Sequence, residues 1–314
     1  MSLSLKEFYE KHGPTFDLEW LEGDLNGDLT GPHVERAGLS LAGHPFEERD
    51  QKMLLFGKME LDFLRDLSAG ERAFRLEETL SSGAICVIIS HHLSPPEELV
   101  AYCKKTKIAL FITALETGSL HSKLTRWLGD FFAPTTFVHG TFVEAYGMGV
   151  LIQGESGVGK SEAALKLIKN GHRLIGDDSI KLQAREGVGL MGFGRELNCH
   201  LLEIRGIGIL NIAELFGAGA VQKKGEVDVV IQLEEWDQGR VYDLVGLEER
   251  FIELLGVSIP LYVQPVSPNR DAADLIETTV LNHRLKEMGR HAAKEFNQKL
   301  LREIARKEKV GHKS

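Results

Sequence analysis

The sequence predicts an α/β protein of two domains, an N-terminal α/β domain over residues 1–130 and a second α/β domain over residues 131–314 that ends in a helical segment. Three features of the 314-residue chain carry this prediction. Strand-like and helix-like segments alternate in the first part, a glycine-rich loop stands between an apolar strand and a helix in the second part, and a long helical stretch follows. Such alternation is typical of parallel sheets covered by helices.

Composition and charge limit the classes of protein to which the chain can belong. Hydrophobic residues make up 43% of the chain, enough for a core in each domain, and no run approaches the roughly 20 apolar residues of a membrane helix. The formal net charge of -9 argues against broad nucleic-acid binding, which needs a basic footprint. No signal peptide is visible and the cysteines Cys86, Cys103 and Cys199 have no paired spacing, so we expect a cytoplasmic protein with reduced thiols.

The elements of the first domain follow a strand–helix–strand order. Ala84–Ser90 is a short apolar, β-branched run that predicts a buried strand, Glu97–Lys105 has a helical pattern, and Ile108–Thr113 predicts a second buried strand. Ser119–Phe132 is amphipathic at helical spacing, and Pro134 ends that helix. We therefore place the domain boundary near residue 130.

The second domain begins with strands and ends with helices. Thr135–Glu144 and Tyr146–Gln153 are predicted to be strands joined by a short turn, and Val227–Leu233 is a further strand. Ala272–Lys309 is predicted to be helical, with a break at Gly289.

The glycine-rich loop matches the pattern G-x-x-x-x-G-K-[ST] of nucleotide-binding proteins. Glycines let backbone N–H groups curl around phosphate oxygens, and the following helix directs the positive end of its dipole at the same anion. The lysine neutralises the outer phosphates and the serine hydroxyl is a ligand for Mg²⁺, so ATP and Mg²⁺ are the predicted cofactors. The residues of the predicted loop are Gly154, Glu155, Ser156, Gly157, Val158, Gly159, Lys160 and Ser161.

Acids follow a strand a short distance beyond the loop. Arg173–Gly176 is a short apolar strand that ends in Asp177 and Asp178, and one of these carboxylates would suit the proton of an acceptor hydroxyl. A solvated turn explains the pair equally well. His139, at the end of another apolar strand, is on position alone better explained as a structural residue, and Glu203 fits a magnesium ligand or a surface strand equally.

Several segments together resemble the HPr kinase/phosphorylase family. They occur in the order and spacing of that family and cover most of the chain. In the second domain they are His139-Gly140, Gly154–Glu162, Gly171–Asp178 and Leu202–Ile209; in the first they are Arg36–Gly43, Leu55–Lys58 and Leu120–Leu128.

The resemblance implies a regulatory N-terminal domain followed by a P-loop kinase domain. It implies phosphorylation of a serine of the phosphocarrier protein HPr, the reverse phosphorolysis to pyrophosphate, and assembly as a homo-hexamer whose last helices help to hold HPr. It further implies that His139, Lys160 and Asp178 are catalytic, with Asp178 as the base, and that Ser161 and Glu203 bind Mg²⁺.

Two positions depart from the family pattern, which has arginine where this chain has Leu244 and Ser267. Neither side chain replaces a guanidinium as a phosphate ligand, which weakens the prediction of phosphorolysis more than that of kinase activity. Two alternatives stay open at this stage, a small-metabolite P-loop kinase and a nucleotide-sensing regulator that does not catalyse transfer.

Overall fold

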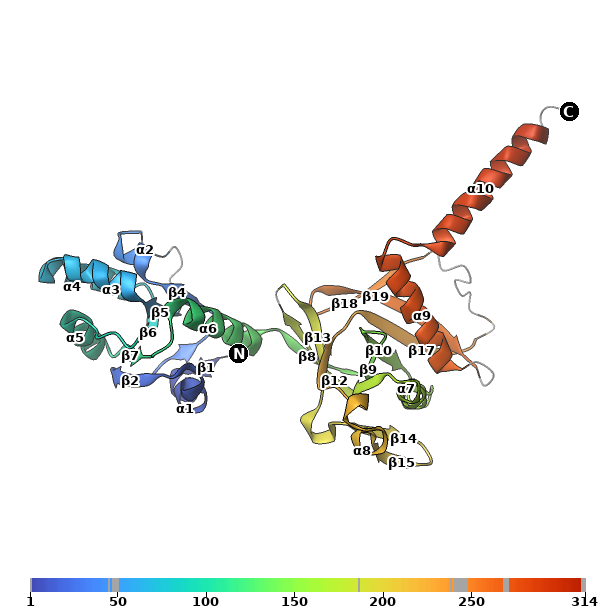
Figure 1. Cartoon of the computed structure of the whole chain (residues 1–314), viewed down its shortest axis with the longest axis horizontal. Helices are drawn as coiled ribbons and strands as arrows, with labels where there is room; N and C mark the ends of the chain where they lie inside the picture. The colour runs from blue at the N-terminus through green and yellow to red at the C-terminus, as the bar shows by residue number, and fades with distance from the viewer. Residues whose placement is uncertain are drawn as a thin grey trace. The chain divides into compact units, whose positions relative to one another are not determined.

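The chain folds as two compact units, Met1–Ala133 and Pro134–Ser314 (Figure 1). The structure is a computed structural model, and it describes residues 2–44, 46, 51–185, 187–237, 239, 248–267 and 271–311. Both units are α/β, as the sequence predicts. Within these ranges, no helix has both the length and the apolar character that a membrane span requires.

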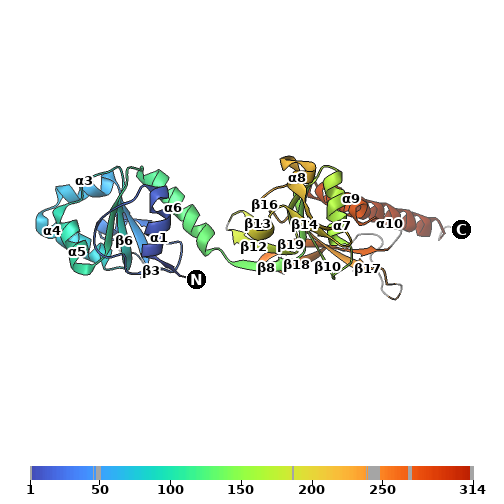
Figure 2. The same cartoon turned by 90° about the horizontal axis from the view of Figure 1, so that it is seen from below.

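The first unit is a five-stranded sheet covered by helices on both faces. Its strand order is β2-β7-β6-β5-β4, in which β4 to β7 run parallel and β2 pairs antiparallel with β7. Helices α2 to α5 pack on one face, and α1 and α6 pack on the other (Figure 2). The bounds are β1 Leu3–Ser4, α1 Leu5–His12, β2 Glu19–Glu22, β3 Asp28–Leu29, β4 Val34–Arg36, α2 Gly38–Leu41, β5 Lys52–Phe56, α3 Lys58–Asp66, α4 Ala69–Leu80, β6 Ala84–Ile89, α5 Glu97–Thr106, β7 Ala109–Ile112 and α6 Thr117–Phe132.

Hydrophobic patterning accounts for these elements. Strands β6 and β7 are almost wholly buried because helices cover both faces of the parallel sheet. Helix α6 buries Leu120, Leu124 and Leu128, which recur every four residues and therefore lie along one stripe.

The second unit is built on a six-stranded sheet of order β11-β9-β10-β17-β19-β18, in which β10, β17 and β19 are parallel. Helices α7 and α9 cover one face, and a four-stranded antiparallel sheet of order β16-β13-β12-β8 packs on the other. The bounds are β8 Thr135–His139, β9 Thr141–Ala145, β10 Met148–Gly154, α7 Lys160–Lys169, β11 Arg173–Gly176, β12 Ser179–Arg185, β13 Gly189–Gly194, β14 Leu201–Ile204, β15 Gly208–Asn211, α8 Ile212–Phe216, β16 Lys224–Glu226, β17 Val229–Glu235, β18 Arg250–Leu254, β19 Val257–Val266, α9 Ala272–Glu287 and α10 Ala292–Gly311.

One predicted strand is in fact two. The prediction of a single strand over Thr135–Glu144 is wrong, because the chain breaks at Gly140 and passes from one sheet to the other. Gly140 has φ of +159°, and a Cβ there would lie 2.6 Å from the Ile152 carbonyl oxygen, so a side chain does not fit. The break between α9 and α10 does fall where it was predicted, around Gly289 with φ of +80°.

Candidate active site

The glycine-rich loop lies between the carboxyl end of β10 and the start of α7. Gly154, Gly157 and Gly159 have φ of +147°, +89° and +100°, in the region that favours glycine. At Gly154 a Cβ would lie 2.4 Å from the Leu233 carbonyl oxygen on the neighbouring strand β17. The loop therefore presents backbone N–H groups and a helix N-terminus at one edge of the sheet, which together form an anion-binding concavity.

The Lys160 side chain folds back over this loop. Its Nζ donates hydrogen bonds to the Gly154 and Glu155 carbonyl oxygens, both at 2.9 Å. These bonds hold a positive charge beside the concavity, where it complements bound phosphate.

Asp177 is the carboxylate closest to the loop serine. It is only 7% exposed, and its Oδ2 accepts a bond from Ser161 Oγ at 3.2 Å. Thr141 Oγ1 donates to Oδ1 at 2.6 Å, and the Glu203 backbone N–H donates to Oδ2 at 3.4 Å. Three separate segments thus fix this carboxylate in one orientation, as burial of an ionised group requires. Sequence reasoning gave Asp177 no role, although its place directly after an apolar strand was the signal.

Asp178, the next residue, faces outward. Its backbone has φ of +67° and its side chain is 78% exposed. His139 lies beside it, with Nδ1 at 3.2 Å from the Asp178 carbonyl oxygen and 3.6 Å from Oδ1. The pairing of Ser179 with His139 across β12 and β8 explains this contact, which the sequence distance of 39 residues had hidden.

The hairpin β14–β15 brings a further acid and a further base to the loop. Glu203 lies on β14 and Arg205 in the turn that follows. The Arg205 guanidinium passes over the loop, because a Cβ on Gly157 would lie 3.0 Å from Nη1. A cavity of about 210 Å³ joins these residues, and we call this side of the loop the acidic flank; it is lined by Ser156, Gly157, Gly159, Lys160, Ser161, Glu162, Asp177, Asp178, Glu203 and Arg205.

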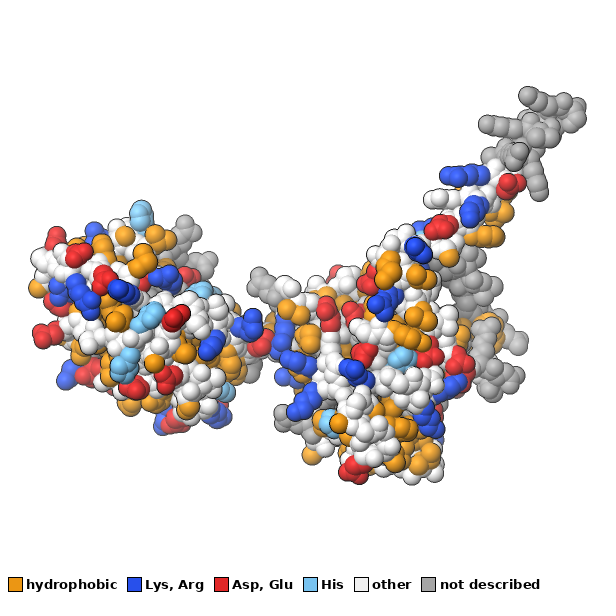
Figure 3. Space-filling model, in the orientation of Figure 1, with side chains coloured by type: hydrophobic (Ala, Val, Ile, Leu, Met, Phe, Trp, Pro, Cys, Tyr) orange, Lys and Arg blue, Asp and Glu red, His pale blue; other side chains and the backbone are white. Residues whose placement is uncertain are grey.

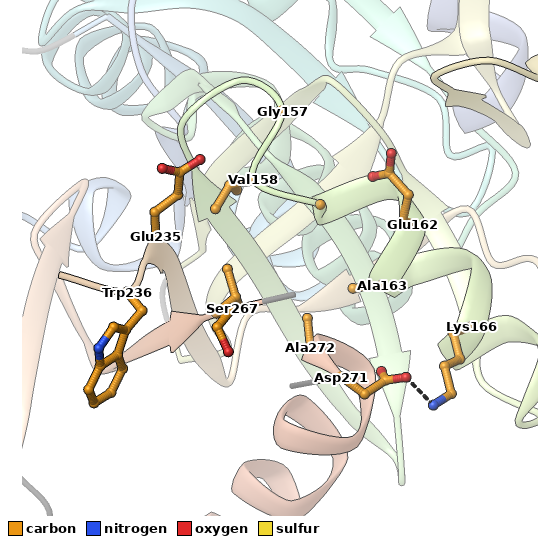
Figure 4. A pocket seen from close by; sticks show the side chains of 12 residues that line it. Gly157, Val158, Glu162, Ala163, Lys166, Glu235, Trp236, Ser267, Asp271 and Ala272 are labelled. Carbon is orange, nitrogen blue, oxygen red and sulfur yellow. Dashed lines mark hydrogen bonds and ion pairs between the residues drawn. The ribbon is translucent and has the colours of Figure 1, made fainter. Parts of the chain in front are cut away.

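A larger cavity of about 910 Å³ lies on the other side of the loop (Figure 4). We call it the apolar flank, because Val158, Ala163, Val266 and Ala272 line it together with the half-exposed ring of Trp236. Lys166 lies at its edge and pairs with Asp271 and Asp274. Trp236 was not predicted as a site residue, although it follows the predicted strand that becomes β17.

The predicted residues thus fall into groups. Lys160, Ser161, Asp178 and Glu203 share the acidic flank, His139 lies next to Asp178, and the predicted loop borders both cavities. Ser267 lines the apolar flank, and Leu244 lies outside the described residues.

The oxygen donors of the acidic flank suit a hard cation. Ser161 Oγ, the Asp177 carboxylate and the Glu203 carboxylate line this one cavity, and an all-oxygen set of this kind fits Mg²⁺. The described residues hold no cluster of three or more His, Cys, Asp or Glu side chains close enough to enclose a metal by themselves. The donor set therefore resembles sites in which the metal is shared with nucleotide phosphates and water.

A phosphate loop bordered by fixed acids at the carboxyl edge of a parallel sheet defines a P-loop phosphotransferase. The model of the HPr Serine kinase C-terminal domain matches residues 130–300, and that of the HPr Serine kinase N terminus matches residues 3–128. The chain therefore belongs to the HPr serine kinase family, whose members are protein-serine phosphotransferases.

Relatives agree with this assignment. The HPr kinase/phosphorylase of Bacillus subtilis (strain 168) is 40% identical over 287 residues, which cover 91% of this chain and 93% of the relative. That of Geobacillus sp. (strain WCH70) is 41% identical over 298 residues, or 94% of each chain. Among solved structures, the Hpr(Ser) kinase/phosphatase from Coxiella burnetii is 36% identical, with a TM-score of 0.47 over 51% of this chain and 98% of that chain.

Proposed function

We propose that the chain uses ATP and Mg²⁺ to phosphorylate a serine of HPr. Relatives that match nine-tenths of the chain bear the name HPr kinase/phosphorylase. The observation that carries the proposal is that one cavity joins the phosphate loop to Asp178, an exposed acid at the end of a strand. Kinases need such a group close to the transferred phosphoryl, because it orients or deprotonates the acceptor hydroxyl.

The two cavities beside the loop divide the nucleotide between them. The triphosphate lies along the loop with its outer phosphates at Lys160, and the nucleoside occupies the apolar flank, where the Trp236 ring offers a flat surface to the base. A cavity of about 910 Å³ with mostly apolar walls has the size and lining of nucleoside sites.

On the acidic flank, Ser161 and Glu203 hold Mg²⁺, with Asp177 fixing the serine hydroxyl and contributing charge. The ion, when bound, neutralises charge on the outer phosphates. Asp178 takes the proton of the acceptor serine, and His139 orients Asp178 or the acceptor. Arg205 contributes a guanidinium above the loop, where negative charge develops during transfer.

The reverse reaction is proposed to be slow. Phosphorolysis holds an additional phosphate as nucleophile, and the family pattern supplies arginine where this chain has Leu244 and Ser267. Arg205 compensates in part; Arg270, which lies outside the described residues, was the other compensating residue suggested by the sequence.

One assay in two directions tests this function. Transfer of the γ-phosphoryl of radiolabelled ATP to HPr is expected in the presence of Mg²⁺, with no labelled product when HPr is omitted. Pyrophosphate release from phosphorylated HPr at saturating phosphate is expected to be much slower on the same preparation. ATP binding without transfer would indicate a nucleotide sensor, and transfer to a small metabolite would indicate a metabolite kinase.

The resemblance also supports a homo-hexamer in the cytoplasm. The molar mass in solution, measured by light scattering, checks the oligomeric state against the 34.9 kDa of one chain.

A further inference from the structure

The outer face of the β16-β13-β12-β8 sheet carries a row of alternating cationic and aromatic residues. The inner face packs against the six-stranded sheet, with Ile180 and Leu182 fully buried. On the outer face, directly paired residues form one row across all four strands because cross-strand partners share a face. The row consists of Lys224, Phe193, Lys181 and Phe137.

Contacts between cations and rings order this face. Lys181 Nζ lies 6.0 Å from the ring centroid of Phe193, and Arg185 Cζ lies 5.7 Å from the same ring. Arg195 Cζ lies 5.7 Å from the Phe137 ring, reaching across the small side chain of Ser179. Each pair brings a guanidinium or ammonium within the range of cation–π attraction.

The face is exposed and predominantly positive. Phe137 is 56% exposed, which is unusual for a phenylalanine on a sheet. Lysine and arginine side chains gather over the region of β12 and β13 (Figure 3). Glu226 is the acid that shares this face, and none of Lys181, Lys224 and Arg195 makes an ion pair with a described residue.

The same face leads to the proposed catalytic groups. His139 lies two residues after Phe137 on β8, so both side chains point to the outer face. Its ring is 91% exposed, and it lies beside Asp178. Two residues along a strand span about 7 Å, so the row begins within one side-chain length of the position where an acceptor serine must stand.

We propose that this cationic–aromatic face, defined by Phe137, Lys181, Phe193, Arg195 and Lys224, docks the protein that carries the acceptor serine. The inference rests on the proposed function and names the surface that the substrate uses. The occupant is a folded protein that presents acidic and apolar side chains beside its serine. Charge complementarity favours an acidic partner, and continuity with His139 favours the acceptor over a protein that binds elsewhere.

The dimensions fit one part of a transient interface. Four strands at about 4.8 Å spacing make the row about 14 Å wide, which is smaller than the roughly 800 Å² that each partner buries in a standard complex. Such a patch therefore works with the rest of the active-site rim. Because its charges are exposed, they act mainly on the rate of association and on salt dependence.

Charge reversal with kinetic separation tests the proposal. In the triple variant Lys181→Glu, Arg195→Glu and Lys224→Glu, we expect the KM for HPr to rise at least about tenfold. ATP affinity, measured by direct titration, and kcat extrapolated to saturating HPr should change less than about twofold, because docking is lost while the chemistry is intact. The matched control, Lys105→Glu with Lys123→Glu, reverses exposed lysines of the first unit and should leave the KM unchanged.

Salt dependence provides a readout that does not depend on the variant folding well. For the unmodified protein the KM for HPr should rise with added NaCl, and this slope should flatten in the triple variant. An unchanged KM in a variant that binds ATP normally, or a KM of the unmodified protein that is independent of salt, overturns the docking assignment.

Two further outcomes are distinct. An altered molar mass with an unchanged KM would show that the face joins copies of this chain. No HPr phosphorylation by the unmodified protein would refute the proposed function itself, whatever the variants do.

Discussion

The two flanks of the phosphate loop differ in chemistry although the same glycines border both. The acidic flank is small and polar, and its Asp177 is fixed by hydrogen bonds from three segments. The apolar flank is four times larger and has hydrophobic walls and an aromatic rim. A polar group fixed by several bonds suits charge stabilisation at a reacting centre, whereas an open apolar cavity suits binding of a nucleoside.

This difference separates rate from affinity. Changes on the acidic flank should lower kcat, because they touch groups whose interactions strengthen in the transition state. Changes on the apolar flank should mainly raise the KM for ATP, because the nucleoside is bound equally before and during transfer. Lys160 lies at the boundary, and its loss should affect the reaction most.

Lys160→Ala is expected to lower kcat/KM by about a thousandfold or more while the protein stays folded. The lysine is held over the loop by two carbonyl oxygens and supplies the positive charge beside the transferred phosphoryl. Steady-state transfer to HPr measures the loss. Lys169→Ala, an exposed lysine at the other end of α7, is the matched control, and near-normal turnover of Lys160→Ala would remove the loop from the mechanism.

Asp178→Asn and Asp177→Asn should separate the two acids. Asp178→Asn is expected to lower kcat by about 10²- to 10⁴-fold at saturating Mg²⁺, because the amide cannot take the acceptor proton. Asp177→Asn should lower kcat less and instead raise the Mg²⁺ concentration needed for half-maximal rate by about tenfold or more, because it removes charge behind Ser161. Mg²⁺ titrations of both variants provide the comparison, and a larger kcat loss at Asp177 would reverse the assignment of the base.

Trp236→Ala tests the apolar flank. The KM for ATP should rise about two- to tenfold with kcat nearly unchanged, in line with the loss of one aromatic contact to a base. Trp236→Phe, which keeps a ring, should restore most of the affinity. Equal KM values for all three proteins would place the nucleoside outside this cavity.

The fold and the acidic flank could be predicted from the sequence to different depths. The loop and its flanking strand and helix were predictable because the motif, the apolar run and the helical pattern are all local. The roles of Asp177 and Trp236 were not, because each depends on partners that only the sheet order brings near: Thr141 and Glu203 in one case, Val158 and Val266 in the other. The break at Gly140 was missed because its cause is a carbonyl oxygen of a neighbouring strand.

Asp228 lies at the opposite edge of the central sheet, at the amino end of β17, and serves as a test that leaves both flanks untouched. Its Oδ2 accepts a hydrogen bond of 2.6 Å from the Gly149 backbone N–H at the start of β10. Burial raises the pKa of Asp228 from 3.8 to about 6, and the bond from Gly149 offsets this only in part. The unfolded chain therefore loses this proton near pH 4, while the folded protein keeps it until about pH 6.

The consequence is that this residue makes the protein less stable as the pH rises from about 4 to 6, with no further change above that range. Asp228→Asn keeps an oxygen acceptor for Gly149 and removes the buried charge. Thermal unfolding at pH 4.5 and pH 7.5 should show a variant whose midpoint exceeds that of the unmodified protein at pH 7.5 by more than it does at pH 4.5. The KM for ATP and the kcat on HPr should be unchanged, because the substitution lies far from the carboxyl edge of the sheet. A midpoint difference that is the same at both pH values would show that Asp228 is ionised in the folded protein throughout this range.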